Sequence, residues 1–570
     1  MTRYNQKNRT NIRARRTGAF RLSALALFSA TVLAALLLRL AHMQLRDGRE
    51  YAFQSEKNSF KNIPMPAVRS PIVDRNGVTM AYDAPGYSLV TLKRNGLWDS
   101  RRVTFEEASE IEEKGSGSGS YVQANPMRTY PHGAVAAHVT GYVGEISPED
   151  LQRFRHKGYR AGDRVGKSGL ERQYELKITG SKGRRKLRVD SKGRFLRDAE
   201  KEEALGGEPF VCAIDMRLQK EAYEALIERG RPGAALVMKA RTGEVLVMAT
   251  NPSFDANLST GGFSPEVWSG LHKDPSHPMM NRAVSVAAPL GSVFKLVTAA
   301  AALNEHILTP ANTFTCRGAF RLGSHSFKCW KGGGHGTLGM AQAIAQSCNV
   351  YFFNAGRQAG VTNLHKYAKM LGLGSRTGID VPGEAIGLIP DPVWKQMFRR
   401  VAWLEGETIN MSIGQGYVQV SPVQALVLAN VYATRGRLVA PRLYLDGKTK
   451  SARVNGLSPE TIEIVRQGMR AAVDGGTAAR FGQLSATSAG KTGTAQDPPR
   501  PMSHAWFVGF APYENPELVY AVFVENAGGG SAEALPVALR VLKLAEQLGY
   551  LGEPPPAPEP DTAISGRGDD

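Results

Sequence analysis

One uninterrupted apolar run near the N-terminus constrains this chain more than any other feature. Leu22 to Leu38 contains no charged residue, and its length is near the lower end of the roughly 17–25 residues that cross a bilayer as a helix. Residues 18–20 and the aliphatic stem of Arg39 extend the run, because a long basic side chain can carry its charge to the membrane surface. The sequence therefore predicts a transmembrane anchor over residues 18–40.

Basic residues are concentrated on the N-terminal side of this run. Since positive charge marks the cytoplasmic side of a membrane helix, we expect residues 1–17 to form a cytoplasmic tail and the rest of the chain to lie outside. A cleaved signal peptide is the alternative, but the run is long for one, and residues 39–43 contain no small-x-small cleavage site. We therefore expect a single-pass protein of the cell (inner) membrane. The basic residues before the run are Arg3, Lys7, Arg9, Arg13, Arg15, Arg16 and Arg21.

The whole chain is long and basic. Its 570 residues predict more than one folding unit, and Lys plus Arg exceed Asp plus Glu by 19. This excess favours lipid head groups or a polyanionic substrate, or it serves solubility alone. The sequence contains no basic-aromatic motif of nucleic-acid recognition, so we expect no nucleic-acid partner.

Residues 551–570 are polar and rich in proline, which predicts a disordered tail.

The character of the sequence changes near residue 206. Residues 41–205 are polar, basic and rich in glycine, they hold no plausible catalytic set, and residues 115–120 alternate Gly and Ser like a flexible linker. From residue 206 to 550, apolar strand-like runs and an Ala-rich helix predict a mixed α/β (α+β) domain with an antiparallel sheet. The expected strands are 234–238, 244–249, 504–510 and 518–524, and the expected helices are 296–303 and 532–548, with Pro536 in the first turn of the last helix.

A serine and a lysine three residues apart offer a nucleophile and a base. Turn-forming residues 289–291 precede Ser292, so we expect this serine at or near a helix N-terminus and Lys295 on the same face one turn later. A hydroxyl becomes a good nucleophile only when a base removes its proton. Lysine can be that base if burial and a nearby cation lower its pKa, and Lys491 is the expected second cation. The backbone N–H of Ser292 is an expected oxyanion donor.

A second motif, Ser347-Cys348-Asn349, follows a predicted helical stretch over residues 340–346. The Ser347 hydroxyl can relay a proton to a leaving amine. The Asn349 amide has both a donor and an acceptor, as a grip on a peptide backbone requires.

A third motif, Lys491-Thr492-Gly493-Thr494, predicts an edge strand facing a cleft. Lys491 offers a positive charge, and Thr492 and Thr494 offer hydroxyls for a terminal carboxylate of the substrate. Gly493 has no side chain, so we expect the substrate backbone to approach closely there. The Thr494 N–H is the expected second oxyanion donor.

Each motif is weak alone, but the three in this order resemble the active-serine acyl transferases that recognise penicillin. The first half of the chain resembles the non-catalytic pedestal of class B penicillin-binding proteins, and three later segments resemble the members that act in cell elongation. The pedestal segments are 69–77, 128–144, 166–171 and 189–194, and the later segments are 377–384, 394–395 and 406–417.

The resemblance implies a peptidoglycan D,D-transpeptidase. Ser292 would attack the penultimate D-Ala carbonyl of a stem peptide, expel the terminal D-Ala and pass the acyl group to an amine of a neighbouring stem peptide. Penicillin and other β-lactams would acylate the same serine. The family alone suggests a SEDS-type membrane glycosyltransferase and elongation-complex proteins as partners. The family usually carries a longer insertion near the Gly-Ser run, so we expect that a pedestal subdomain is missing there and that an engineered linker replaces it. A natural low-complexity loop is the alternative.

Two other functions stay open from the sequence. A D,D-carboxypeptidase or β-lactamase would pass the acyl group to water, although a soluble hydrolase needs neither an anchor nor a pedestal. A β-lactam sensor or a non-catalytic scaffold is the other alternative. A scaffold would not need three intact motifs, and a sensor would need a larger cytoplasmic region than residues 1–17.

The cysteines suggest a metal site. The chain has Cys212, Cys316, Cys329 and Cys348, and the last three bracket His335 with 12, 5 and 12 residues between successive members. A Cys3His set suits tetrahedral zinc. The family resemblance points the same way, because some members have a four-ligand zinc site in the same segment. We therefore expect zinc on these four residues. A Cys316–Cys329 disulfide, or plain buried thiols, are the alternatives.

Overall fold

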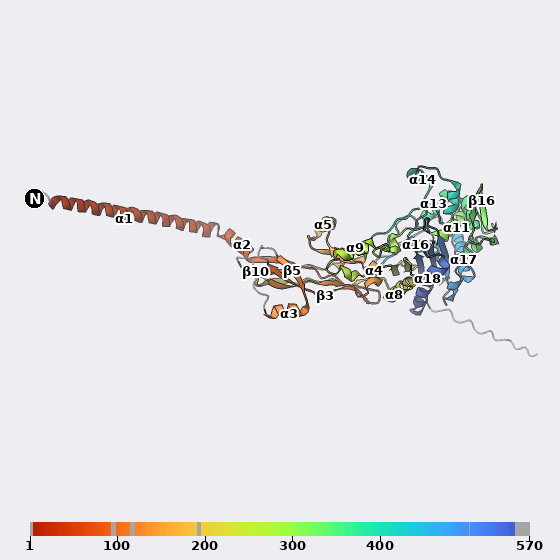
Figure 1. Ribbon diagram of the computed structural model, residues 1–570, viewed down its shortest axis with the longest axis horizontal. Helices are drawn as coiled ribbons and strands as arrows, with labels where there is room; N and C mark the ends of the chain where they lie inside the picture. Colours follow the sequence, from red (N-terminus) through yellow and green to blue (C-terminus); the bar gives the residue numbers. More distant parts are fainter. Residues whose placement is uncertain (1–3, 93–97, 115–119, 191–194, 501, 553–570) are drawn as a thin grey trace, which may run out of the picture. The chain divides into compact units, whose positions relative to one another are not determined.

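The computed structural model describes residues 4–92, 98–114, 120–190, 195–500 and 502–552 (Figure 1). By their contacts these residues form two compact units. The first comprises Met1–Ala67, Pro85–Pro126 and Ser181–Leu205, and the second comprises Val68–Ala84, Met127–Gly180 and Gly206–Asp570. The range 41–205 is therefore shared between the two units. The Gly-Ser linker at 115–119 and the tail from 553 lie outside the described residues.

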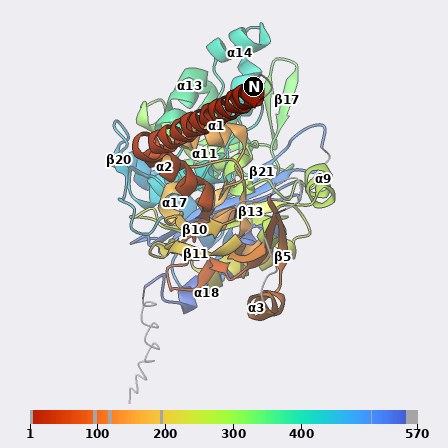
Figure 2. The same ribbon diagram turned by 90° about the vertical axis from the view of Figure 1, so that its left-hand side faces the viewer.

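The first unit begins with a long helix, α1 (Tyr4–Ala41), followed by a π-helical turn (His42–Arg46) and α2 (Gly48–Ser59) (Figure 2). Among the described helices, the segment Gly18–Arg46 alone is long and apolar enough to cross a membrane, and its side chains are exposed to the surroundings. The expected helix is confirmed. The unit also contains two three-stranded sheets, β1-β10-β11 and β5-β4-β6. Its other elements are β1 (Phe60–Met65), β4 (Tyr87–Leu92), β5 (Trp98–Val103), α3 (Phe105–Lys114), β6 (Ser120–Ala124), β10 (Gly183–Val189) and β11 (Phe195–Glu202).

A five-stranded antiparallel sheet in the order β14-β13-β23-β22-β21 organises the second unit. The four strands expected from the apolar runs are confirmed, with bounds within about two residues, as is usual for such assignments. The third motif lies on the edge strand β21, as predicted. The strands are β13 (Gly233–Lys239), β14 (Val245–Asn251), β21 (Ala489–Ala495), β22 (His504–Ala511) and β23 (Leu518–Val524).

Alternate residues of the central strands enter two different hydrophobic cores, because successive side chains of a strand point to opposite faces. On one face Val508 and Val519 pack with α11 (Lys295–Asn304) and α16 (Pro422–Ala433). On the other face Phe507 and Val522 pack with α8 (Met216–Ile227) and α18 (Gly530–Gln547). The helices that cover the sheet are labelled in Figure 1. The sheet is thus buried on both sides, which makes it a rigid support for residues on its edge.

One detail of the predicted closing helix is wrong. Helix α18 begins at Gly530 rather than residue 532, so Pro536 lies inside the helix and not in its first turn. Proline costs stability in a helix interior because it lacks an N–H. The burial of most of the apolar face of α18, including Leu535, Val537 and Leu542, offsets this cost.

A buried ion network organises the pedestal segments that belong to the second unit. Arg69 donates hydrogen bonds to Glu171 and Glu175, and Arg128 donates to Glu171 at 2.7 Å and to Asp83 at 3.2 Å. Burial disfavours the carboxylate form of Glu171, but Arg128 and Arg69 outweigh it and lower the pKa of this group. The network joins residues that are distant in sequence. It connects to the small sheet β12-β2-β3-β7, whose strands are Phe210–Val211, Ile72–Val73, Thr79–Ala84 and Met127–Thr129.

The second unit also contains further short helices and strands. They are α4 (Gly133–Thr140), β8 (Val143–Glu145), α5 (Pro148–Phe154), β9 (Arg164–Gly166), α6 (Gly169–Gln173), α7 (Glu175–Ile178), α9 (Pro265–Lys273), α10 (Arg282–Ser285), η4 (Gly291–Phe294), β15 (Phe314–Cys316), β16 (Ala319–Leu322), β17 (His325–Lys328), β18 (Gly336–Leu338), α12 (Met340–Ala345), α13 (Asn349–Met370), α14 (Pro392–Arg399), α15 (Glu405–Met411), β19 (Arg437–Val439), β20 (Ser451–Arg453) and α17 (Pro459–Asp474).

Candidate active site

Ser292 lies in a short 3-10 turn, η4, that runs directly into α11. This agrees with the expected position near a helix start. Gly291 has a φ of 58°, and a Cβ there would lie 2.6 Å from the carbonyl oxygen of Thr494, so only glycine lets the turn pack this closely on β21. Gly291, Val293 and Phe294 are buried, whereas Ser292 is partly exposed. The turn therefore presents one hydroxyl from an otherwise buried segment.

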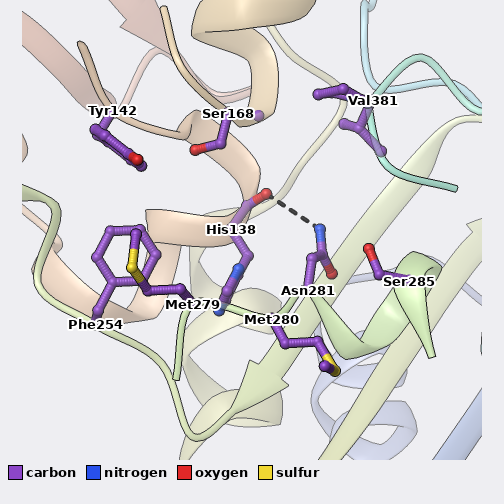
Figure 3. A pocket seen from close by; sticks show the side chains of 11 residues that line it. His138, Tyr142, Ser168, Phe254, Met279, Met280, Asn281, Ser285 and Val381 are labelled. Atoms are coloured by element: carbon purple, nitrogen blue, oxygen red, sulfur yellow. Dashed lines mark hydrogen bonds between the residues drawn. The ribbon is translucent and has the colours of Figure 1, made fainter. Parts of the chain in front are cut away.

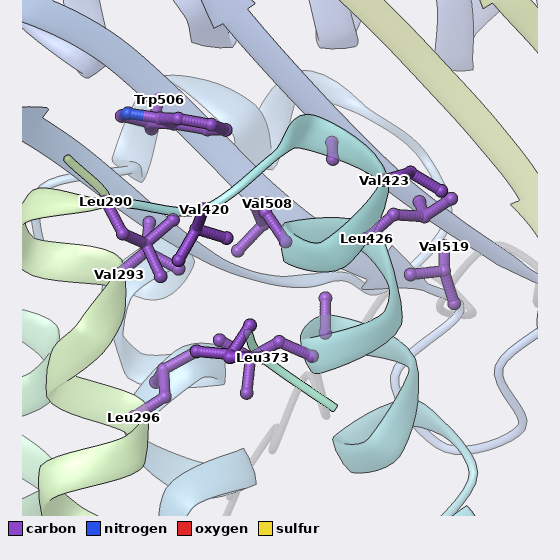
Figure 4. Close-up of a cluster of buried hydrophobic side chains, with 14 of the residues drawn as sticks. Leu290, Val293, Leu296, Leu373, Val420, Val423, Leu426, Trp506, Val508 and Val519 are labelled. Carbon is purple, nitrogen blue, oxygen red and sulfur yellow. The ribbon is translucent and has the colours of Figure 1, made fainter. Parts of the chain in front are cut away.

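Hydrophobic packing holds this turn and helix in place (Figure 4). Val293 and Leu296 lie in the same buried cluster as Val508 on the sheet, and Leu296 is fully buried. The indole N–H of Trp506 donates a 2.9 Å hydrogen bond to the carbonyl of Pro289, just before the turn. The sheet and the turn are thereby fixed to each other, and a displacement of either would move Ser292.

Lys295 is fully buried and joins the first motif to the second. Its Nζ donates to the Ser347 carbonyl and to Asn349 Oδ1, both at 2.7 Å, and it lies 3.3 Å from the Ser347 hydroxyl. Burial lowers the pKa of Lys295 to about 7, because the charged form loses its hydration. A substantial neutral fraction at physiological pH is what a general base requires.

Lys491 joins the third motif to the same hydroxyl. Its Nζ lies 2.9 Å from Ser347 Oγ and donates to the Thr492 carbonyl, also at 2.9 Å. Burial lowers the pKa of Lys491 well below its usual value, and the charge of Lys295 lowers it further. Ser347 itself has a φ of 52°, an unusual backbone conformation for serine, and it is 5 % exposed. Strained residues of this kind persist where surrounding contacts over-determine them.

The threonines of the third motif have different environments. Thr494 is exposed, and its hydroxyl accepts a 3.4 Å hydrogen bond from the N–H of Gly530. Thr492 is nearly buried, and its hydroxyl donates at 2.9 Å to Thr477. Thr477 carries no motif and was not expected from the sequence. It lies just after α17, and only the folded structure brings it beside Thr492.

The structure gives a different reason for Gly493 from the one expected. A Cβ at this position would lie 2.9 Å from Trp506 Cβ and 3.0 Å from both the Leu290 carbonyl oxygen and Val293. The missing side chain therefore lets β21 pack against its own turn.

The fold thus brings together Lys295, Ser347, Asn349 and Lys491 through direct hydrogen bonds. The Ser292 hydroxyl forms no hydrogen bond with another described residue, although catalytic hydrogen bonds are often formed only when substrate is bound.

Trp330 is a further residue that the sequence did not indicate. Its indole Nε1 is 3.1 Å from the carbonyl oxygens of both Gln346 and Ser347, and its exposed fraction is 58 %.

Three cysteines and one histidine converge beside this site. The ligand atoms of Cys316, Cys329, His335 and Cys348 all lie within 4.8 Å of one another, and the three cysteines are buried. Cys329 Sγ is 3.6 Å from His335 Nδ1. Each of the four cysteines in the chain is a free thiol. Cys348 is the residue directly before α13, so the cluster adjoins both polar members of the second motif.

A separate cavity of about 210 Å³ contains none of the three motifs (Figure 3). Tyr142, Phe254 and Met279 line it, and Asn281 donates a 3.4 Å hydrogen bond to the His138 carbonyl. Burial lowers the pKa of His138 to about 4, so this imidazole is neutral at physiological pH. The cavity lies between the pedestal segments, the segments before Ser292 and the loop with Val381 and Pro382, all within the second unit.

Sequence comparisons match most of the chain to known proteins. The sequence pattern described as "Penicillin binding protein transpeptidase domain" matches residues 233–543, and "Penicillin-binding Protein dimerisation domain" matches residues 99–211. A relative from Acinetobacter baumannii, "Peptidoglycan D,D-transpeptidase MrdA", is 31 % identical over 87 % of this chain and 83 % of its own length.

Two solved structures are also similar. The complex of penicillin-binding protein 2 with MreC from Helicobacter pylori matches with a TM-score of 0.79 and 28 % identity, covering 86 % of this chain and 100 % of that one. A structure described as "Structural coordination of polymerization and crosslinking by a peptidoglycan synthase complex" matches with a TM-score of 0.73 and 31 % identity, covering 93 % of this chain and 98 % of that one.

Proposed function

Because this chain belongs to the penicillin-binding protein transpeptidase family, we propose that Ser292 is the acylated nucleophile of a peptidoglycan D,D-transpeptidase. The protein is a serine-type enzyme that cross-links stem peptides and is inhibited by penicillin. The convergence of Lys295 and Lys491 on the Ser347 hydroxyl supports the assignment of roles to residues.

In the first half-reaction the Ser292 Oγ attacks the penultimate D-Ala carbonyl of a donor stem peptide. Neutral Lys295 takes the hydroxyl proton, and the backbone N–H groups of Ser292 and Thr494 stabilise the oxyanion. The amide C–N bond then breaks, the leaving D-Ala amine receives a proton through Ser347, and an ester to Ser292 remains. Asn349 holds the substrate backbone, and Lys491, Thr492 and Thr494 hold the terminal carboxylate.

In the second half-reaction an amine of a neighbouring stem peptide attacks the ester. Its proton passes back through the Ser347 and Lys295 groups, the C–O bond breaks, and Ser292 regains its hydroxyl. A β-lactam follows the first half-reaction only, because its ring-opened product stays attached to the serine. A hydrolase that uses water is the less favoured function, since the curated relatives are named transpeptidases.

The Cys3His cluster fits zinc. From zinc–sulfur and zinc–nitrogen bond lengths, a sulfur and a nitrogen bound to one tetrahedral zinc are about 3.6 Å apart, and Cys329 Sγ and His335 Nδ1 are 3.6 Å apart. Cys316, Cys329, His335 and Cys348 would hold the ion. When bound, zinc would brace the turn that carries Ser347 and Asn349, without taking part in the acyl transfer. Four converging ligands favour this over a Cys316–Cys329 disulfide.

The anchor and the partners extend the proposal. Helix α1 would cross the membrane once, with residues 1–17 in the cytoplasm and the second unit on the outer side of the inner membrane, since basic residues precede the apolar run. A SEDS-type glycosyltransferase and elongation-complex proteins would be the partners. The similar structures of a complex with MreC and of a peptidoglycan synthase complex support this class of partner.

Mass spectrometry of the penicillin-treated protein tests the nucleophile. We expect one penicilloyl group on the peptide that contains Ser292, and no labelling of a Ser292→Ala variant. Ser285→Ala is the matched control, because Ser285 lies one helix earlier and its hydroxyl donates only to the Gly383 carbonyl among the described residues. Labelling of Ser292→Ala at the rate of the unchanged protein would reject the assignment.

A further inference from the structure

Three arginines converge on a pocket of about 330 Å³ that lies away from the active site. Arg241 comes from the turn between β13 and β14, and Arg435 and Arg437 come from the segment that leaves α16 and enters β19. The turn between β22 and β23 closes the pocket with Asn515 and Pro516. All three arginines are exposed. Two separate chain segments thus deliver three guanidinium groups to one concave surface, and a third segment closes it.

The register of the sheet places the pocket and the acyl-transfer site at opposite ends of the strands. Arg241 lies two residues after Lys239, which pairs with Leu518, the first residue of β23. Thr494 pairs with Ala505, which lies level with Val524, the last residue of β23. Strands β13 and β21 are also three positions apart in the sheet, which corresponds to about 14 Å at the usual spacing between strands. A ligand in the pocket would therefore not occupy the substrate site.

The protein leaves most of the donors in this pocket unused. Arg241 donates through Nη2 to Asn515 Oδ1, Arg435 through Nη2 to the Glu514 carbonyl, and Arg437 through Nη2 to Ser451 Oγ. Within the described ranges, Nε and Nη1 of each guanidinium make no hydrogen bond, and none of the three forms an ion pair with a carboxylate. An arginine that is placed by one contact and keeps its other donors free is suited to bind an oxyanion in a bidentate manner.

Other positive groups strengthen the local field. Arg437 lies directly opposite Arg453 on the neighbouring strand β20, an arrangement of like charges that costs stability. Arg466 is fully buried and donates to the carbonyl of Ala433, a residue that lines the pocket. Burial lowers the pKa of Arg466, and the charge of Arg435 lowers it further. An anion bound above these groups would relieve this repulsion.

The acidic side chains nearby are already engaged elsewhere. The Glu514 carboxylate accepts from Thr487, and Glu517 accepts from Asn515 at 3.3 Å. Glu463 faces Arg466 at 3.5 Å and accepts from Tyr513. None of these carboxylates lies within ion-pair distance of the three pocket arginines in the part of the chain that the structure describes. The charge of the pocket therefore remains uncompensated.

We propose that Arg241, Arg435 and Arg437 form a binding site for a phosphate or diphosphate group. Three guanidinium groups match an oxyanion with more than one negative charge better than a single carboxylate. The volume also exceeds what a phosphate alone needs, so the site accommodates an organic group attached to it. The group comes from a soluble phosphate compound or from the head group of an anionic lipid.

Calorimetric titration of the full chain in detergent micelles tests the site with two soluble probes. Inorganic pyrophosphate stands for a soluble phosphate compound, and glycerol 3-phosphate stands for the phosphomonoester head group of an anionic lipid. In the triple variant Arg241→Gln, Arg435→Gln, Arg437→Gln we expect the bound probe to lose more than about tenfold in affinity, because three charge-assisted contacts disappear. The probe that binds the unchanged protein with the higher affinity identifies the source of the phosphate.

A matched control variant shows whether binding depends on the pocket arginines or only on the overall positive charge of the protein. Arg321→Gln, Arg376→Gln, Arg480→Gln removes three exposed arginines outside the pocket, and we expect its affinity to stay within about twofold, since distant surface charges are screened by salt. Penicillin labelling of Ser292 should continue in both variants, which shows that they are folded. Equal weakening in both variants, or no binding of either probe to the unchanged protein, would refute the site.

Discussion

The Nζ of Lys491 lies 2.9 Å from the hydroxyl oxygen of Ser347, and the Nζ of Lys295 lies 3.3 Å from the same atom. Two ammonium groups cannot both donate to one hydroxyl without repulsion in a buried site, so the pair favours a state in which one lysine is neutral. In the proposed mechanism, Ser347 is therefore the link through which a proton passes between the base and the leaving group.

The rate of penicillin acylation should therefore depend on pH through the lysines. Burial lowers the pKa of Lys295 to about 7, and a base is active only when it is deprotonated. The acylation rate should be low where Lys295 is protonated, rise through neutral pH and level off about one to two units above that pKa. Stopped-flow fluorescence with a fluorescent penicillin would measure this profile. A rate that is constant from weakly acidic to weakly basic pH would contradict the role of Lys295.

Trp330→Phe should slow acylation without unfolding the protein. The change removes the indole N–H that lies 3.1 Å from the Ser347 carbonyl but keeps an aromatic ring next to His335. One net hydrogen bond contributes about 1 kcal/mol, which corresponds to roughly a fivefold lower acylation rate if the bond positions Ser347. Trp268→Phe is the control, because Trp268 is an exposed tryptophan on α9. If both variants react equally fast, Trp330 has no positioning role.

Gly493→Ala should destabilise the protein and reduce acylation together. The new methyl group would lie about 3 Å from Trp506 Cβ, Val293 and the Leu290 carbonyl, and overpacking of this kind typically costs about 1–3 kcal/mol. Relief of the clash would separate β21 from the turn that carries Ser292. Denaturant unfolding and penicillin labelling would measure the two effects.

Gly270→Ala provides the control for this substitution. Gly270 lies within α9, and a Cβ there would meet nothing within 4 Å. Since alanine favours helix formation over glycine, this variant should be unchanged or slightly more stable. A Gly493→Ala protein with unchanged stability would show that the packing of β21 tolerates a side chain.

Metal analysis should find about one zinc per chain, as a single tetrahedral site requires. Cys316→Ser should lower the zinc content and the melting temperature, because the site loses one of its buried thiolates. Cys212→Ala is the control, since Cys212 lies next to Met80 and outside the cluster. Protein that is purified without chelator, folded and free of zinc would exclude the metal.

The sequence predicted the chemistry of the site better than its geometry. The order of the three motifs identified Ser292, Lys295, Ser347 and Lys491 as candidates, and the apolar runs identified the strands on both sides of the site. Strand alternation and helix periodicity are local properties, so they can be read from neighbouring residues. The position of Pro536 was predicted wrongly because helix ends depend on a few weak contacts rather than on periodicity.

Contacts between distant segments could not be read in this way. Thr477 beside Thr492, and Trp330 beside the Ser347 carbonyl, carry no local signature, and the reason for Gly493 is a close approach of the Leu290 backbone. The residue types and their spacing along the chain already specified an anchored serine acyltransferase. Folding alone established which lysine meets which hydroxyl, how deeply each is buried and therefore how far its pKa is lowered, because these depend on groups that approach one another only when the sheet and helices pack.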